Sequence, residues 1–197
     1  MPGYLEAPTE FKGTAMTTLL GIAGALRRHS TNRMLVREAA RHFAPDRFTE
    51  ADLRLPLFDA DLEAEAGIPA EVQTLSDQIA AADAVVIATP EYNKALPGVL
   101  KNALDWVSRT KGAPLRDKPV AIVSATAGRA GGERSQFSLR LCLVPFRPRL
   151  LMGPEVLIAD SGAAFDADGR LQGERAAAAL ADLMADLRML AEAAARE

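Results

Sequence analysis

The sequence contains little cysteine, histidine or aromatic residue. Its 197 residues include one cysteine, Cys142, and two histidines, and aromatic residues make up 5% of the chain. A single thiol cannot form an internal disulfide, and no group of Cys and His has the spacing of a metal site. We therefore expect neither a disulfide framework nor a metal centre, and this cysteine usage fits a cytoplasmic protein best.

Long apolar runs and clusters of one charge sign are also missing. The apolar runs 17–24 and 84–89 are far too short to cross a bilayer, and no basic segment followed by a long apolar stretch opens the chain. The 23 basic and 26 acidic residues are spread along the sequence and give a net charge of -3. Without a basic tract that could follow a phosphate backbone, we expect neither nucleic acid nor a membrane as a partner.

What the chain does contain is an alternation of short apolar runs with helical patterns, which is typical of parallel βαβ units. Five strands and five helices are expected, separated by loops. The strands are predicted at 17–24, 47–53, 84–89, 119–126 and in part of 150–158, and the helices around 35–43, from 69, from 97, over 134–144 and over 180–191. The stretch between the second strand and Gly67 is expected to be irregular.

The length and the hydrophobic content of 49% favour one domain over residues 17–197. Residues 1–16 contain Pro and Gly without periodicity and are expected to form a flexible leader. Met16 directly precedes the first predicted strand, so the sequence leaves open whether translation starts at Met1 or at Met16.

Three loops follow the carboxyl ends of predicted strands, where open parallel sheets bind their ligands. The first covers residues 24–32 and contains Ala25, Arg27, Ser30, Thr31 and Asn32. A helix N-terminus with hydroxyl, amide and guanidinium donors is suited to a phosphate group. The alternative is that Ser30 or Asn32 caps the helix and the arginines are solvated.

The other two loops are suited to a flat heteroaromatic ring. The second contains Pro90, Glu91, Tyr92 and Asn93, where an aromatic side chain stands beside backbone amides. The alternative for this loop is an ordinary turn in which the tyrosine hydroxyl is hydrogen-bonded within the protein. The third covers 124–132 and includes Ser124, Ala125 and Gly128, and its glycines let a ligand approach the backbone closely.

The stretch 90–106, which reads PEYNKALPGVLKNALDW, resembles the signature of the NAD(P)H-dependent FMN reductases, a family that includes chromate and quinone reductases. Loop 24–32 resembles the family segment around the FMN phosphate, and loop 124–132 resembles its flavin-edge segment. Together with residues 165–171, the resemblance covers nearly everything from Met16 onward. It implies a three-layer flavodoxin-like α/β fold, with helices on both faces of a five-stranded parallel sheet in the order 2-1-3-4-5.

The resemblance also implies an activity. Electrons would pass from NADH or NADPH through bound FMN to a small acceptor such as a quinone, free flavin or chromate. Because the flavin carries the chemistry, no residue is assigned as a catalytic acid or base. A homodimer or homotetramer with the flavin near the partner subunit is implied as well, whereas the acceptor and the choice between NADH and NADPH stay open.

Two positions depart from the family pattern. Ala25 and Ala95 stand where the family commonly has serine. Loss of the hydroxyl at residue 25 removes one phosphate contact, which is worth ~1 to 3 kcal/mol, so weaker FMN binding is a hypothesis. Two other classes of protein stay open: a flavodoxin-type electron carrier, which the mild net charge disfavours, and a flavin-binding accessory protein without reductase activity.

Overall fold

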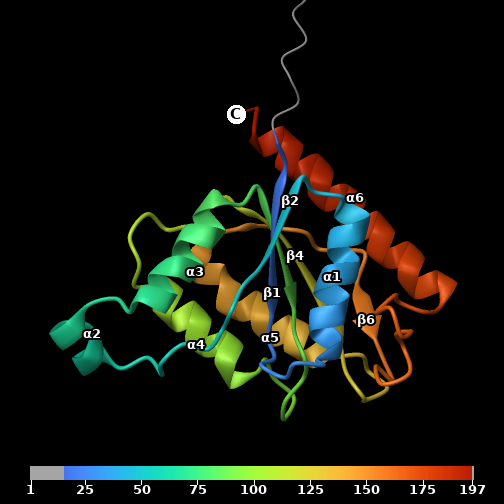
Figure 1. Ribbon diagram of the computed structural model, residues 1–197, viewed down its shortest axis with the longest axis horizontal. Helices are drawn as coiled ribbons and strands as arrows, with labels where there is room; N and C mark the ends of the chain where they lie inside the picture. The colour runs from blue at the N-terminus through green and yellow to red at the C-terminus, as the bar shows by residue number, and fades with distance from the viewer. Residues whose placement is uncertain (1–15, 197) are drawn as a thin grey trace, which may run out of the picture.

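A parallel β-sheet lies between two layers of helices in the computed structural model, which describes residues 16–196 (Figure 1). Its strands follow the order β2-β1-β3-β4-β5, and β6 also pairs with β4. Every pairing is parallel. The strands are β1 (Thr18–Ala23), β2 (Arg47–Glu50), β3 (Ala84–Ala88), β4 (Pro119–Ala125), β5 (Arg149–Leu150) and β6 (Val156–Ile158).

The helices divide between the two faces of the sheet. One face is covered by α1 (Thr31–Phe43) and α6 (Glu174–Ala194). The other is covered by α3 (Ala70–Ala81), α4 (Gly98–Val107) and α5 (Glu133–Leu143), after which a 3-10 turn spans Val144–Phe146. The short helix α2 (Ala60–Ala66) projects from the rest of the fold in Figure 1.

The central strands are apolar on both faces because each face carries its own core. In β3, Val86 packs into the core under α1 and α6, whereas Val85 and Ile87 pack into the core under α3 and α4. Successive side chains of a strand point to opposite faces, so a strand buried on both sides reads as a continuous apolar run. This explains why β3 and β4 are clear in the sequence.

The predicted fold class and strand order are confirmed, and three details of the prediction are wrong. The second strand ends at Glu50 rather than at residue 53, and the fifth strand is split into β5 and β6 by residues 151–155. The stretch expected to be irregular contains α2, which no apolar pattern marks because none of its residues is buried. The predicted leader lies outside the described residues except for Met16, and the domain division stays a prediction.

An arm formed by residues 51–66 leaves the sheet after β2 and is fixed to the outer side of α4. Asn102 Nδ2 and Trp106 Nε1 both donate to the carbonyl of Pro56, at 2.9 and 2.8 Å. The amide of Phe58 donates to Asn102 Oδ1, and the Phe58 ring meets the Trp106 ring edge-on at 5.0 Å between centroids. Two residues of the motif 90–106 therefore serve to hold this arm.

Candidate functional site

A cleft of about 740 Å³ opens at the carboxyl edge of the sheet, between the loops that follow β1, β3 and β4. The structure brings most of the predicted site residues together around it. Those that line it are Ala25, Arg27, Ser30, Thr31, Asn32, Pro90, Glu91, Tyr92, Ala125 and Gly128. Asn93 and Ser124 do not line it. The three loops picked out from the sequence thus share one hollow.

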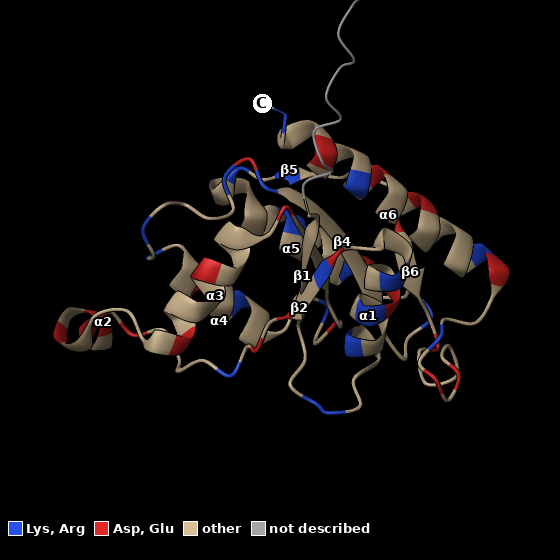
Figure 2. Ribbon diagram, turned by 45° about the horizontal axis from the view of Figure 1, so that its top comes forward, with Lys and Arg blue, Asp and Glu red and all other residues tan. Residues whose placement is uncertain are grey.

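The first wall of the cleft is the N-terminus of α1. The buried Ser30 caps the helix, because its Oγ accepts a hydrogen bond from the amide of Asn32. The amide of Thr31 has no acceptor among residues 16–196, and the first turn of α1 contains no acidic residue. The positive end of the helix dipole therefore faces the cleft without a carboxylate of its own first turn to balance it. Figure 2 shows further positive charge, in blue, on the loop that joins β1 to α1.

Asn32 and Thr31 connect this wall to the far side of the cleft. The Asn32 side chain is buried and bonds to the backbone of Ala125 at the end of β4. Thr31 Oγ1 donates to Ser161 Oγ at 3.2 Å, and the Ser161 amide donates to the carbonyl of Thr126. The start of α1 and the loop after β4 are therefore joined by the side chains of Thr31, Asn32 and Ser161, which come from two separate segments.

The second wall ends in a tight turn. The amide and carbonyl of Tyr92 pair with those of Ala95, and the two residues between them, Asn93 and Lys94, have φ angles of +51° and +67°. Asparagine tolerates this left-handed conformation better than most residues, which accounts for Asn93 as part of the turn. Tyr92 is 53% exposed and lines the mouth of the cleft, while Pro90 is buried beneath it.

The cleft also holds a carboxylate with one unsatisfied oxygen. Glu91 Oε1 lies 3.7 Å from Arg134 Nη1, whereas Glu91 Oε2 is buried and has no hydrogen-bond partner. A buried acceptor without a donor is costly, so this oxygen is suited to an N–H or O–H group from a bound molecule.

The third wall is the loop after β4, and two glycines fix its path. Gly131 and Gly132 have φ angles of +61° and +95°, and a Cβ on Gly132 would stand 2.8 Å from the Cβ of Ser124. Ser124 is fully buried and its Oγ donates to the carbonyl of Gly131 while accepting from Gln136 Nε2. Ser124 therefore fixes the backbone of this loop from the buried side, away from the cleft.

Sequence reasoning missed several residues of the cleft. Arg129 and Arg134 add guanidinium groups, and Ser161 comes from the segment after β6. Arg129 lay inside a predicted loop, so its charge was a usable signal. Ser161 is 130 residues from its partner Thr31, and no local pattern relates them.

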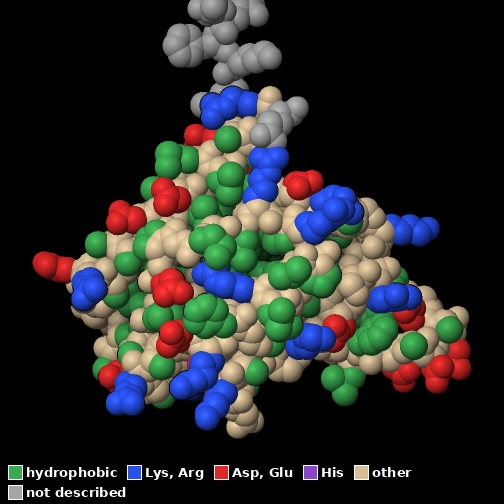
Figure 3. Space-filling model, turned by 180° about the vertical axis from the view of Figure 1, so that it is seen from behind, with side chains coloured by type: hydrophobic (Ala, Val, Ile, Leu, Met, Phe, Trp, Pro, Cys, Tyr) green, Lys and Arg blue, Asp and Glu red, His purple; other side chains and the backbone are tan. Residues whose placement is uncertain are grey.

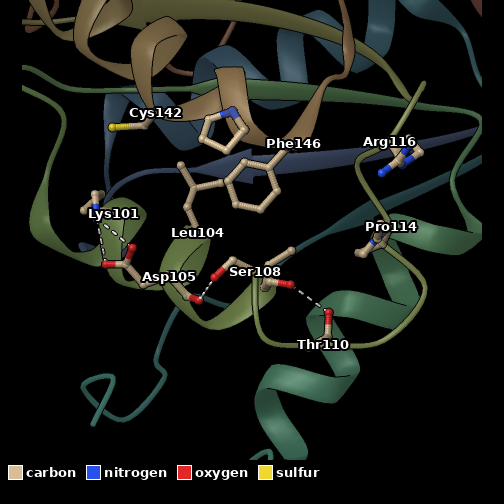
Figure 4. A pocket seen from close by; sticks show the side chains of 12 residues that line it. Lys101, Leu104, Asp105, Ser108, Thr110, Pro114, Arg116, Cys142 and Phe146 are labelled. Carbon is tan, nitrogen blue, oxygen red and sulfur yellow. Dashed lines mark hydrogen bonds and ion pairs between the residues drawn. The ribbon is translucent and has the colours of Figure 1, made fainter. Parts of the chain in front are cut away.

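A second hollow of about 440 Å³ lies between α4 and the end of α5 (Figure 4). Leu104 and Phe146 provide apolar surface there, and Lys101 Nζ bonds to both oxygens of Asp105. That hydrogen bond raises the pKa of Lys101. No predicted site residue lines this hollow.

The fold and the cleft together define a class of protein. A flavodoxin-like parallel sheet binds its ligand at the carboxyl edge, and here that edge offers an exposed helix N-terminus, arginines and an aromatic rim. This is the arrangement of an α/β protein that binds a phosphorylated aromatic ligand.

Comparisons with known proteins identify the family. The model of the NADPH-dependent FMN reductase family matches residues 17–164. An NAD(P)H-dependent FMN reductase of Pseudomonas aeruginosa is 45% identical over 160 residues, covering 80% of this chain and 86% of that protein. A quinone reductase of Escherichia coli is 43% identical over 140 residues, or 69% of this chain and 74% of that protein. Among solved structures, the flavoenzyme NAD(P)H:(acceptor) oxidoreductase FerB of Paracoccus denitrificans has a TM-score of 0.80 at 31% identity, covering 90% of this chain and 98% of that chain.

The chain belongs to the NADPH-dependent FMN reductase family. This membership confirms the expected class of enzyme, an oxidoreductase that uses FMN and NAD(P)H. The residues present fit FMN. The unpaired amide of Thr31 and the guanidinium of Arg27, which line the same cleft, suit its phosphate, and the unpaired Glu91 Oε2 can accept a hydrogen bond from it. None of the helices within residues 16–196 is both long and apolar enough to span a bilayer.

Proposed function

We propose that this chain holds FMN in the cleft and uses it to carry two electrons from NADH or NADPH to a quinone. The observation that carries the proposal is the cleft itself, where a helix N-terminus with no acidic residue in its first turn faces an aromatic rim. The Escherichia coli relative named quinone reductase supports a quinone as the acceptor. Hydride from the donor, with one proton from solvent, balances the reduction of a quinone to a hydroquinone.

The phosphate of FMN would lie at the N-terminus of α1. The unpaired amide of Thr31 and the guanidinium of Arg27 would donate hydrogen bonds to this phosphate, since both residues line the cleft. Ser30 and Asn32 would act indirectly, because Ser30 Oγ caps the helix and the Asn32 amide is bonded to Ala125. Of the predicted phosphate ligands, we therefore assign direct contact to Arg27 and Thr31, and a positioning role to Ser30 and Asn32.

The flavin ring would lie between the loop after β3 and the loop after β4. Bound FMN would supply the chemistry of hydride transfer from the nicotinamide and of electron transfer to the acceptor. Pro90 and Tyr92 would provide apolar contact, and Glu91 Oε2 would accept a hydrogen bond. The backbone of Ala125 to Gly128 would approach the ring edge, where Gly128 leaves space. Asn93 and Ser124 would keep these two loops in shape.

An absorption spectrum tests this proposal. Purified protein is mixed with FMN, desalted, and then treated anaerobically with NADH or NADPH. Retained flavin that bleaches with a nicotinamide and regains its colour with a quinone supports the proposal. Retained flavin that stays oxidised would instead favour an electron carrier, and no retained flavin would contradict the proposed phosphate site.

A pair of arginine variants localises the phosphate site in the same experiment. Arg27→Gln should lose FMN on desalting because it removes a guanidinium that lines the cleft. Arg28→Gln is the matched control, since Arg28 is exposed and does not line the cleft. Equal retention by the two variants would contradict the assignment of Arg27.

We further propose that the protein is a cytoplasmic homodimer or homotetramer that associates through α5. Phe137 and Leu141 are 57% and 74% exposed and lie one turn apart on the same side of α5, and Val144, which is 66% exposed, follows in the 3-10 turn; these three residues form an apolar stripe. Figure 3 shows apolar side chains in green at the surface of the rear face, behind the sheet in Figure 1. The hollow of Figure 4 lies beside this stripe. Leu104 and Phe146, which line it, would contact an apolar side chain of a second copy of the chain.

The mass of the protein in solution tests this contact. By light scattering after size exclusion, Phe137→Asp with Leu141→Asp should reduce the assembly to a smaller species. Leu57→Asp is the control, because Leu57 is 80% exposed but lies on the arm. A wild-type monomer, or a double variant of unchanged mass, would contradict an interface on α5.

A further inference from the structure

Two of the three arginines around the cleft have unpaired guanidinium groups. Within residues 16–196, the side chains of Arg27 and Arg129 make no hydrogen bond or ion pair, whereas Arg134 lies 3.7 Å from Glu91. Both free arginines are exposed at the surface of the cleft. Since no carboxylate of the described chain pairs with them, they are available to anions that enter.

The two free arginines belong to different loops. Arg27 stands in the loop before α1, close in sequence to the free amide of Thr31, whereas Arg129 stands in the loop after β4. The proposed function brings three kinds of phosphate group to the cleft: the phosphate of FMN, the diphosphate that NADH and NADPH share, and the 2′-phosphate that only NADPH carries. The helix N-terminus and Arg27 account for the phosphate of FMN, which leaves Arg129 for a phosphate of the nicotinamide donor.

Arg129 is presented by a loop whose backbone is well fixed. The amide of Gly131 donates to the carbonyl of Gly128 at 3.1 Å, which closes a turn around Arg129. The amide of Thr126 donates to the carbonyl of Ile158 at 2.9 Å, and Ser124 Oγ donates to the carbonyl of Gly131. A guanidinium on a fixed turn loses less freedom when it binds a ligand than one on a mobile segment.

We propose that Arg129 binds the 2′-phosphate of NADPH and thereby makes the enzyme prefer NADPH to NADH. This inference rests on the proposed function, since it assumes that a nicotinamide donor enters the cleft. A phosphate monoester carries nearly two negative charges at neutral pH and matches the fork of a guanidinium. The two donors differ only in this phosphate, so one arginine that contacts it is sufficient for discrimination.

The test compares kcat/KM for NADPH and NADH, with a quinone as the acceptor, in FMN-loaded protein. The wild type should prefer NADPH, and Arg129→Gln should lower kcat/KM for NADPH by about 10- to 100-fold while leaving NADH nearly unchanged. Arg129→Lys should retain part of the preference, because it keeps the charge but loses the fork. Arg28→Gln is the matched control and should behave as the wild type.

A binding measurement provides a readout independent of turnover. Calorimetric titration of FMN-loaded protein with adenosine 2′,5′-bisphosphate should give a lower Kd than titration with adenosine 5′-monophosphate. Arg129→Gln should remove that difference. An unchanged difference would show that the 2′-phosphate is bound elsewhere.

The remaining outcomes separate this inference from the proposed function. Wild-type flavin that bleaches with neither donor would overturn the proposed function, and with it the inference. Wild-type protein that oxidises both donors equally well would overturn the role of Arg129 alone. The same holds if Arg129→Gln slows both donors equally, since Arg129 would then bind the diphosphate that they share, or if it loses FMN on desalting, since Arg129 would then serve the flavin.

Discussion

The side-chain amide of Asn32 bonds at both ends to a single residue, Ala125. Its Nδ2 donates to the Ala125 carbonyl at 2.8 Å, and its Oδ1 accepts from the Ala125 amide at 3.0 Å. Asn32 thus pairs with the end of β4 as a neighbouring strand would, although it belongs to the first turn of α1. One side chain sets the separation between two walls of the cleft.

Replacement of Asn32 should therefore weaken both the fold and FMN binding. Asn32→Ala leaves a buried amide and a buried carbonyl of Ala125 unpaired, which should lower the free energy of unfolding by about 2 to 4 kcal/mol. Asn32→Asp should cost more, because a carboxylate oxygen would face the Ala125 carbonyl. Urea unfolding measures the first effect and FMN retention the second.

Asn93→Gly is the control for Asn32. Asn93 has a φ of +51° and does not line the cleft, so glycine can take its place in the turn. The free energy of unfolding should change by less than about 0.5 kcal/mol. Unfolding of Asn32→Ala at the urea concentration of the wild type would contradict the bridging role.

Gly132 should not tolerate a side chain. Gly132→Ala combines a φ of +95° with a Cβ 2.8 Å from that of Ser124, so we expect a loss of about 2 to 4 kcal/mol and release of FMN. Gly128→Ala is the matched control for stability in the same loop, because its Cβ would meet only Thr126 Oγ1 at 4.0 Å. Thermal unfolding of the FMN-free protein distinguishes the two variants, and equal melting temperatures would argue against a fixed loop.

Restoring a hydroxyl at residue 25 should tighten FMN binding. Ala25 is 8% exposed and lines the cleft beside the N-terminus of α1. A serine there would add a donor to a charged phosphate, worth ~1 to 3 kcal/mol, or about 5- to 150-fold in Kd. Quenching of FMN fluorescence measures the Kd of Ala25→Ser, with Ala127→Ser in the third wall as the control. An unchanged Kd would place the phosphate out of reach of residue 25.

Trp106→Phe should loosen the arm without affecting the cleft. The variant loses the Nε1 donor to Pro56, while Asn102 still bonds to the same carbonyl, so stability should fall by about 1 kcal/mol. Limited proteolysis should then cut within residues 57–66 faster than in the wild type, with FMN retention unchanged. Arg109→Gln is the control, because its ion pair with Glu63 joins a half-exposed arginine to the arm and contributes less than about 1 kcal/mol.

The fold was predictable where burial leaves a trace in the sequence. β3 and β4 are apolar on both faces, and Pro69 and Pro97 mark the starts of α3 and α4. α2 was not predictable, since a helix that buries no residue has no apolar period. The split of the last strand was hidden as well, because β5 and β6 are too short to show alternation.

The site was predictable as loops but not as contacts. The positions of Arg27 and Tyr92 after apolar runs were enough to place them at one edge of the sheet. Asn32 also looked like a phosphate ligand, yet its amide is bonded to Ala125, 93 residues further along the chain. Such a pairing depends on how α1 crosses the sheet. No local sequence pattern shows which distant residue will lie beside Asn32.

The arm has a practical consequence for work on this enzyme. It is held by Asn102 and Trp106 of α4 and by Arg109 just beyond that helix, and α2 adds no residue to either core. A peptide tag or fluorophore inserted in α2 would therefore lie on the outside of the molecule, away from the loops that line the cleft. A label in α2 would therefore report on binding of the nicotinamide donor without altering the sheet.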